Sequence, residues 1–397
     1  MDIFQLPQSA LHYPKPEAPM LPLFEFYNCS ITPNSRDQSR FLASDVLYLP
    51  SGRMALYYAL QLLGVNSLSQ VLVPAYHCGS MVEPIIYLGA TPRFFHINKY
   101  LEVISSELEQ HLSPETKAML LPHFFGFPQD LEPIREFCTK HNIALIEDCA
   151  HAFFQQSHPL GLGSVGDFSI TSTVKFFPGV EGGILACNNP SFDLAQIKRA
   201  APSLVNQIKS LLHTLETSAS YGRLSVLGKL LNIRTHNADD PSKPQKSTNE
   251  KPQTRTLNRE SMQWFIPEQI GQDASWGTRF IAIYSNLQHI IDKRRDNYCY
   301  YLAKLKDTPN IRPLHPELPD QVIPYIFPLI LEQPEIHFPI LKQAGVPIWR
   351  WEELVVSNCP ISTDYRLCLI QLPCHQSLNI QELDWIIDTL ISTVTQP

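Results

Sequence analysis

Short apolar strands alternate with helical segments between residue 51 and about residue 190, and this alternation constrains the fold more than any other feature. Residues 51–65 predict a helix with apolar side chains on one face. Residues 118–126 form a continuous apolar run, which is typical of a buried parallel strand. Further strands are expected at 70–76, 91–97 and 144–150, and further helices at 80–90, 105–112 and 133–142. Because the connections are short, we predict an α/β fold with a mostly parallel sheet covered by helices on both faces.

The second half of the chain predicts a smaller α+β domain. The helical pattern over residues 275–305 is too long for a single capped helix without a bend. Beyond it we expect a strand at 322–331, a helix at 337–345, a strand near 367–373 and a final helix from Gln381. Residues 236–260 contain few apolar side chains and predict a mobile surface insertion. The expected parts are an N-terminal segment (1–40), a large domain (41–275) that includes the insertion, and a small C-terminal domain (276–397).

The composition narrows the classes of function. The formal net charge of −7 is spread along the chain, so we expect no nucleic-acid partner. No basic start is followed by an apolar run and no stretch approaches about 18 apolar residues, so we predict neither a signal peptide nor a membrane span. The nine cysteines lack CxxC or Cys/His metal spacing, which indicates reduced thiols, a cytoplasmic location and no metal site.

The first chemical motif is SGRMAL at residues 51–56, which places a glycine directly before an amphipathic helix. The start of a helix has free N–H groups and a positive potential, which suit a phosphate. Any helix can begin after Ser-Gly, so this motif alone is also compatible with an ordinary helix start.

The second motif is ALIEDCAHAF at residues 144–153, an apolar strand that ends in Glu147 and Asp148. Ligands bind at the carboxyl edge of parallel sheets, and these two acids are expected at that edge. A single carboxylate there could equally cap a helix or bind a metal.

The third motif lies at residues 166–185, where Lys175 stands in an apolar setting between a Ser/Thr cluster and Gly182-Gly183. Burial depresses the pKa of a lysine amine and makes it a usable nucleophile for aldehydes. Ser172 precedes Lys175 by three positions and could hydrogen-bond a phosphate bound nearby. By itself, this lysine could also lie in a surface loop.

Together the three motifs predict pyridoxal 5′-phosphate as the cofactor. A phosphate-binding helix start, an acid at a strand edge and a lysine followed by Glu-Gly-Gly occur in this order along the chain. The acid, Asp148, would keep the pyridine nitrogen protonated, so that the ring can accept electrons from the substrate carbon. Lys175 would hold the aldehyde as a Schiff base and then move a proton as a base, which makes it the predicted catalytic residue.

The sequence resembles the DegT/DnrJ/EryC1/StrS aminotransferases, fold-type I pyridoxal phosphate enzymes that act mainly on keto-sugar nucleotides. The matching segments lie between about residue 40 and residue 397, outside the insertion: SGRMAL, VPAYHC, GATPRFFHI, LLPHFFGFPQDLEPI, IEDCAHAF, VKFFPGVEGG, FPLI and LPCHQSL. The resemblance implies the fold-type I architecture and a homodimer with its active site near the subunit boundary. It also implies transfer of an amino group from an amino acid, with glutamate or glutamine as the expected donor, to a keto acceptor such as a keto-sugar nucleotide.

The same resemblance assigns roles to individual residues. It implies that Asp148 pairs with the pyridine nitrogen, that His151 approaches the cofactor hydroxyl and that Lys175 carries the cofactor. The backbone of Gly52 and Arg53 would hold the phosphate, although the family usually has Gly-Thr at these two positions.

Two further positions depart from the family pattern. Cys78 stands where the family usually has an aromatic residue stacked on the cofactor, which leaves His77 or Tyr76 to cover the ring. The family's phosphate serine lies five residues before the lysine, and that position is Ile170 here. The neighbouring candidates for the phosphate contact are Ser169 and Ser172.

Other polar residues have less specific patterns. His123 and His375 could line the pocket, and each could equally be a packed residue. Residues 294–297 predict a solvated, charged helix face. Residues 349–351, Trp-Arg-Trp, could face a substrate or form a hydrophobic cluster whose arginine reaches outward.

Two other functions fit the same residues. The first is another pyridoxal phosphate reaction, such as that of a lyase. The second is a non-catalytic binding or regulatory protein that keeps the fold, which the altered phosphate and stacking positions would suit.

Overall fold

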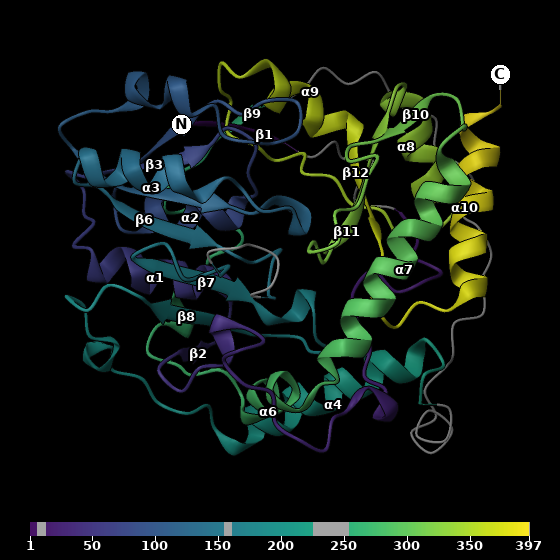
Figure 1. Cartoon of the computed structure of the whole chain (residues 1–397), viewed down its shortest axis with the longest axis horizontal. Coiled ribbons are helices and arrows are strands. Elements are labelled where there is room, and N and C mark those ends of the chain that lie inside the picture. The colour runs from purple at the N-terminus through teal and green to yellow at the C-terminus, as the bar shows by residue number, and fades with distance from the viewer. Residues whose placement is uncertain (6–12, 155–160, 225–253, 397) are drawn as a thin grey trace.

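A seven-stranded sheet forms the centre of the computed structural model (Figure 1), which describes residues 1–5, 13–154, 161–224 and 254–396. Its strand order is β2-β8-β7-β6-β5-β3-β4. The strands are β2 (Leu47–Leu49), β3 (Gln70–Pro74), β4 (Thr91–Phe95), β5 (Thr116–Pro122), β6 (Ala144–Asp148), β7 (Phe168–Ser172) and β8 (Gly183–Cys187). The pairs from β4 through β3, β5 and β6 to β7 are parallel, whereas β8 runs antiparallel to both of its neighbours. The prediction of a mostly parallel sheet is confirmed.

Helices cover both faces of this sheet, because alternate side chains of each strand point to opposite faces. The covering helices are α1 (Gly52–Leu62), α2 (Gly79–Tyr87) and α3 (Leu131–Lys140). Val71 and Val73 of β3 belong to the apolar cluster that includes α1 and α2. Leu72, between them, belongs to the opposite cluster, which includes α3. The helix predicted at residues 105–112 is instead the 3₁₀ helix η4 (Ser105–His111).

The long helical pattern at residues 275–305 is divided, as predicted, into α6 (Trp276–Tyr284) and α7 (Leu287–Leu305). The break occurs at Ser285 and Asn286, which have extended backbones. The side chain of Asn286 then caps α7, because its Oδ1 accepts a hydrogen bond from the backbone N–H of His289 at 3.1 Å.

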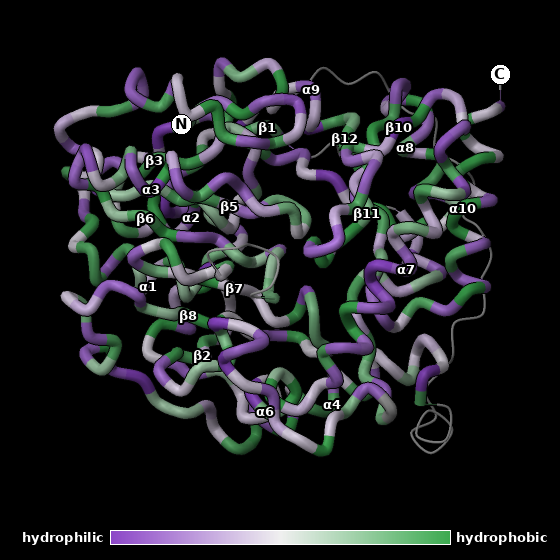
Figure 2. The backbone as a smooth tube through the Cα atoms, viewed as in Figure 1, coloured by the Kyte–Doolittle hydropathy of each residue, from purple (hydrophilic) through white to green (hydrophobic). Residues whose placement is uncertain are grey.

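A smaller antiparallel sheet lies beside the large one (Figure 1). Its strands are β10 (Ile311–Pro313), β11 (Ile326–Leu331) and β12 (Leu369–Pro373), and its helices are α8 (Pro334–Gln343), α9 (Pro360–Cys368) and α10 (Ile380–Val394). Hydrophilic and hydrophobic residues mix along α7 and α10 (Figure 2), whose apolar sides pack on this sheet. The expected α+β arrangement is therefore present, while the domain boundary at residues 275 and 276 stays a prediction.

Most of the predicted insertion, residues 236–260, lies outside the described residues. Its last part is described and forms β9 (Thr254–Thr256), which pairs antiparallel with β1 (Asp2–Phe4). The remaining helices are α4 (Leu204–Ser220), η2 (Phe26–Asn28), η3 (Arg40–Leu42), η5 (Phe124–Gly126), η7 (Thr173–Lys175), η8 (Leu194–Gln196) and η9 (Pro267–Gln269). None of the helices in the described ranges combines the length and the apolar character needed to cross a membrane.

Candidate cofactor site

A cavity of about 590 Å³ opens at the carboxyl ends of β5, β6 and β7, where parallel sheets bind ligands. Residues from the large sheet and its helices form one side, which we call the sheet wall: Gly52, Arg53, Asp148, His151, Ser172 and Lys175. Residues that follow α8 in sequence form the other side, which we call the C-terminal wall: Trp349, Arg350, Trp351, Glu352, Glu353 and Gln371. Six of the eight residues predicted to bind the cofactor therefore meet in one cavity.

Lys175 ends the short helix η7, directly after strand β7. Its Nζ lies 5.4 Å from the centre of the Tyr325 ring. Burial lowers the pKa of the Lys175 amine, and the nearby positive charge of Arg53 lowers it further, although Cys78 and Asp148 act in the opposite direction. The amine is therefore more easily neutral than that of an exposed lysine, as a nucleophile for aldehydes must be.

Asp148 is the last residue of β6 and is almost fully buried at the base of the cavity. Its Oδ1 accepts a hydrogen bond from the backbone N–H of Ala150 at 2.9 Å. Burial raises the pKa of the Asp148 carboxyl, and the positive charge of Lys175 counteracts this effect. This arrangement suits a carboxylate that binds a positively charged partner in the cavity.

His151 lies between aromatic rings in the sheet wall. It stacks on Tyr325, with the ring centres 4.5 Å apart, and on Phe125 at 5.5 Å, while the Trp351 ring lies 5.6 Å away. Burial keeps the pKa of His151 well below its ordinary value, so the ring is neutral. Its Nδ1 accepts a hydrogen bond from the backbone N–H of Phe125 at 3.2 Å, and the ring proton is therefore on Nε2.

The start of α1 lies against the ends of β7 and β8. Ser51 caps the helix. A Cβ on Gly183 would lie 2.1 Å from the Ser51 carbonyl carbon, so only glycine permits this approach. Gly52 makes a second close approach, because a Cβ added to it would lie 3.2 Å from the Thr171 carbonyl oxygen. With the Arg53 guanidinium beside them, the free N–H groups of this helix start form a site for an anion.

Two predicted cofactor residues, His77 and Ser169, do not line the cavity. The Nδ1 of His77 lies 3.0 Å from the Ala75 carbonyl oxygen, and its Nε2 accepts a hydrogen bond from the backbone N–H of Val355 at 3.1 Å. Ser169 donates to the Gly163 carbonyl at 2.7 Å. Both side chains are fully buried and hold the fold together, so neither belongs to the site that we propose.

The aromatic residues at the cavity also differ from those expected. Tyr76, the other candidate to cover the cofactor ring, is completely buried and stacks on Trp351 at 4.9 Å between ring centres. The Trp264 ring packs against Gly79, so closely that a Cβ added to this glycine would lie 2.4 Å from the ring. Trp264 and Tyr325 both line the cavity, and no local motif in the sequence distinguishes them from core aromatic residues.

The expectation of a solvated helix face for Arg294, Arg295 and Asn297 is wrong at Arg294 and Asn297, whereas Arg295 is half-buried. Arg294 is fully buried and donates hydrogen bonds to the carbonyls of Tyr325 at 2.8 Å and Lys175 at 2.7 Å. Asn297 is also buried and donates to the carbonyl of His375 at 3.0 Å. Helical spacing alone could not reveal this, because the carbonyls come from distant parts of the sequence.

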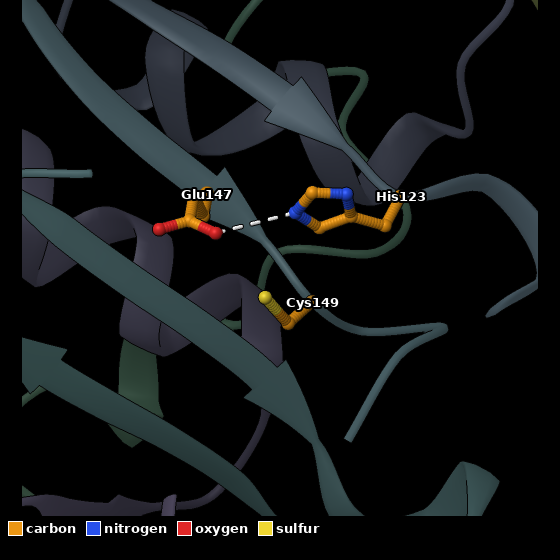
Figure 3. A group of neighbouring side chains, drawn as sticks. All are labelled: His123, Glu147 and Cys149. Atoms are coloured by element: carbon orange, nitrogen blue, oxygen red, sulfur yellow. Dashed lines mark hydrogen bonds and ion pairs between the residues drawn. The ribbon is translucent and has the colours of Figure 1, made fainter. Parts of the chain in front are cut away.

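His123 lines the cavity, as it could from the sequence, and forms a buried group with Glu147 and Cys149, in which the His123 ring points at the Glu147 carboxylate (Figure 3). The His123 Nε2 lies 3.3 Å from Glu147 Oε2, and its Nδ1 accepts a hydrogen bond from the Gln129 N–H. Glu147 also accepts hydrogen bonds from three backbone N–H groups, those of Gly163, Val165 and Gly166. Because the His123 nitrogens and the Glu147 oxygens already have partners, these two residues hold strand ends and loops together, and we assign the group no metal.

The sheet wall fits pyridoxal 5′-phosphate. It offers an amine for the aldehyde, a buried carboxylate for the ring nitrogen and a helix start with an arginine for the phosphate. These three groups define the cavity as a candidate site of the pyridoxal phosphate class.

Comparison with known proteins agrees with this class. Residues 42–212, which include Lys175, match the model of the DegT/DnrJ/EryC1/StrS aminotransferase family. A curated relative is UDP-N-acetyl-3-dehydro-alpha-D-glucosamine 3-aminotransferase of Acidithiobacillus ferrooxidans, which is 35% identical over 129 residues. This alignment covers 32% of the chain and about a third, 34%, of the relative.

Two solved structures have the same fold over most of the chain. The aminotransferase TlmJ of Streptoalloteichus hindustanus has a TM-score of 0.59 at 18% identity, covering 88% of this chain and 86% of its own. NtdA of Bacillus subtilis, solved with the bound cofactor PMP, has a TM-score of 0.56 at 19% identity, covering 88% and 73%. At these identities, the likeness establishes the fold.

Proposed function

We propose that the protein is a pyridoxal phosphate-dependent aminotransferase that moves an amino group from an amino acid to a keto acceptor. One observation supports this most strongly: Lys175 and Asp148, from two adjacent strand ends, line one cavity beside the start of α1. The match of residues 42–212 to an aminotransferase family model supports the reaction type.

Pyridoxal phosphate, when bound, supplies an aldehyde that an amine can hold and a ring that accepts electrons from a substrate carbon. Asp148 would hold a proton on the ring nitrogen, because its carboxylate is buried at the base of the cavity. His151 has its hydrogen on Nε2 and can donate it to an oxygen in the cavity. The helix start at Gly52 and the Arg53 side chain would bind the phosphate.

Lys175 would have two roles. Its amine would hold the cofactor, and the free Nζ would accept and return a proton at the reacting carbons of the substrate. The lowered pKa of Lys175 favours both roles, because only the neutral amine can act as nucleophile or base. Arg294 fixes the backbone of this residue by donating a hydrogen bond to its carbonyl.

We propose a keto sugar as the acceptor, carried on a nucleotide. The curated relative from Acidithiobacillus ferrooxidans, which matches about a third of the chain (32%), is named for a UDP-linked 3-dehydro sugar. The tryptophans of the C-terminal wall suit the flat face of a sugar ring.

The experiment that tests this function separates the two half-reactions. Glutamate alone, added to the protein loaded with pyridoxal phosphate, should convert the absorbance of the aldehyde form into that of the amine form and release 2-oxoglutarate. A panel of keto-sugar nucleotides and small keto acids should then restore the first spectrum. No conversion with any of several amino acids would contradict the proposal and favour a lyase or a non-catalytic protein.

We also propose that the protein acts as a cytoplasmic homodimer. Helices α4 and α6 contact one another and expose apolar side chains, among them Leu204, Ile208, Trp276 and Phe280. All nine cysteines are free, which suits a reducing compartment. Light scattering on the purified protein should give the mass of two chains. A single-chain mass, unchanged by replacing Leu204 and Phe280 with glutamate, would contradict the dimer.

A further inference from the structure

The C-terminal wall contains two side chains that are fixed to one face by backbone pairing. Trp349 and Gln371 are opposite one another in an antiparallel bridge, with Gln371 N–H donating to the Trp349 carbonyl at 2.7 Å and the reverse bond at 3.2 Å. Residues opposite one another in an antiparallel pair project their side chains to the same side. Both line the cavity, so this pairing presents an indole ring and a carboxamide to the same space.

Besides Arg350 Nε, which faces a carboxylate oxygen of Glu352, two polar atoms of this wall are buried without a hydrogen-bond partner among the described residues. They are Nε2 of Gln371, in a residue that is 1% exposed, and Oε2 of Glu352, in a residue that is 5% exposed. Buried polar atoms of folded proteins nearly always have partners, so an orphan in a cavity wall indicates a ligand position. One atom is a donor and the other an acceptor, which together suit a ligand that carries hydroxyl groups.

The charges of the wall favour a neutral ligand group here. Arg350 Nε lies 2.9 Å from Glu352 Oε1, and Arg255 Nη2 lies 3.6 Å from Glu353 Oε1, so each cation already faces a carboxylate. In the part of the chain that the structure describes, the other lining cations, Arg53 and Lys175, belong to the sheet wall. A phosphate on the C-terminal wall would therefore meet carboxylates, whereas a hydroxyl can donate to one.

An aromatic surface completes the wall. Trp349 is 41% exposed, and Trp351 is held by its stacking on the buried ring of Tyr76. Indole faces pack well against the C–H face of a sugar ring, while the ring hydroxyls point outward to polar partners.

We propose that Gln371 and Glu352, together with Trp349, recognise the hydroxyl-bearing ring of the acceptor and determine the choice between acceptors. The inference rests on the proposed function and deepens it. Gln371 Nε2 donates to one ring oxygen and Glu352 Oε2 accepts from a hydroxyl, while Trp349 covers the ring face. A nucleotide diphosphate attached to this ring extends away from the two glutamates.

The test compares two ketones in the second half-reaction: a nucleoside diphosphate-linked 4-keto hexose, which has ring hydroxyls, and pyruvate, which has none. Gln371→Leu and Glu352→Gln should each raise the KM for the keto hexose about tenfold, as the loss of one hydrogen bond requires. The KM for pyruvate should stay the same. Gln61→Leu makes the same change at an exposed position in the last turn of α1 and should alter neither value.

Three results would overturn the proposal: equal loss for both ketones, no loss for either, or loss in the Gln61→Leu control as well. If Gln371→Leu does not fold, Trp349→Ala, at a partly exposed residue, serves as the second variant and should show the same selectivity. The donor half-reaction of the unaltered protein is measured first, so that a failure of the proposed function is recognised separately. Quenching of tryptophan fluorescence by the keto hexose gives a binding readout independent of turnover, and the two polar variants should weaken it about tenfold.

Discussion

The two walls of the cavity differ in how their polar groups are satisfied. In the sheet wall, Asp148 and His151 each accept a hydrogen bond from a backbone N–H, and Arg294 holds the backbone carbonyl of Lys175. In the C-terminal wall, Gln371 and Glu352 each keep a buried atom without a partner among the described residues.

This difference separates the chemistry of the cavity from its selectivity. Groups that must be held in one protonation state and position are preorganised by the strand ends on which they stand. Groups that recognise a variable substrate keep atoms that only the substrate can satisfy. Changes in the sheet wall should therefore affect every substrate, whereas changes in the C-terminal wall should affect acceptors selectively.

Replacing Lys175 with alanine should have the largest effect. The variant lacks the amine that holds the cofactor and moves the proton, so amino transfer should fall by at least about a thousandfold with every acceptor. The rate of the donor half-reaction measures this. Lys140→Ala, at an exposed position on α3, is the control and should retain full activity. Residual activity of Lys175→Ala near that of the control would break the assignment of the sheet wall.

Asp148→Asn and Glu147→Gln make the same chemical change at adjacent positions. Asp148→Asn should slow the donor half-reaction on the order of a hundredfold, since the ring nitrogen loses its carboxylate, with little loss of stability. Glu147→Gln should instead reduce the free energy of unfolding by about 2 kcal/mol, because its amide N–H₂ would face backbone N–H donors. The rate of the donor half-reaction and the free energy of unfolding are measured for both variants. A slower half-reaction in Glu147→Gln together with a lower stability of Asp148→Asn would contradict these roles.

Arg294→Leu should have an intermediate effect. It leaves the carbonyls of Lys175 and Tyr325 without their donor, so the free energy of unfolding should fall by about 2–3 kcal/mol. The loosened Lys175 backbone should also lower kcat about tenfold. Arg295→Leu is the matched control one position along α7, and should lower kcat less. Equal effects of the two variants on kcat would show that Arg294 has no special part in positioning the lysine.

The smallest effect on activity is expected at His375, which concerns stability in acid. His375 is buried, with Nε2 at 2.9 Å from the Pro19 carbonyl, and burial lowers its pKa to about 3. Below the unfolded pKa of about 6.5, the unfolded chain binds a proton that the folded chain does not, so stability decreases as the pH falls. Between pH 6 and pH 4, this histidine should contribute about 1.4 kcal/mol of lost stability per pH unit. The free energy of unfolding of His375→Gln, measured with denaturant at several pH values, should fall less steeply with decreasing pH, by that amount. An unchanged dependence on pH would contradict the prediction.

Much of the sheet wall could be predicted from the sequence, because its residues stand next to strands that have a strong pattern. The apolar run before Glu147 and Asp148 places both acids at the carboxyl edge of a parallel sheet. Neighbouring strand residues point to opposite faces of the sheet, as Val71 and Leu72 do. The glycines at 182 and 183 mark a close backbone approach, although the sequence does not say which segment approaches.

The remaining features depend on contacts between distant segments. His77 and Ser169 are polar residues near the motifs, yet each bonds to a backbone group inside the fold instead of facing the cavity. Arg294 has the helical spacing of a surface residue, yet it is buried and donates hydrogen bonds to the carbonyls of Lys175 and Tyr325. Gln371 lies in the middle of an apolar strand, where only its pairing with Trp349 directs it to the cavity. No local pattern could reveal these partners.

The central claim is that Lys175 is the residue that holds the cofactor. Borohydride treatment of the protein loaded with pyridoxal phosphate reduces the bond between the lysine and the cofactor to a stable amine, and mass spectrometry of the digested protein then locates it. We expect the reduced cofactor on Lys175 and on no other lysine. An unmodified Lys175, with the cofactor either on another lysine or on none, would contradict this account of the site.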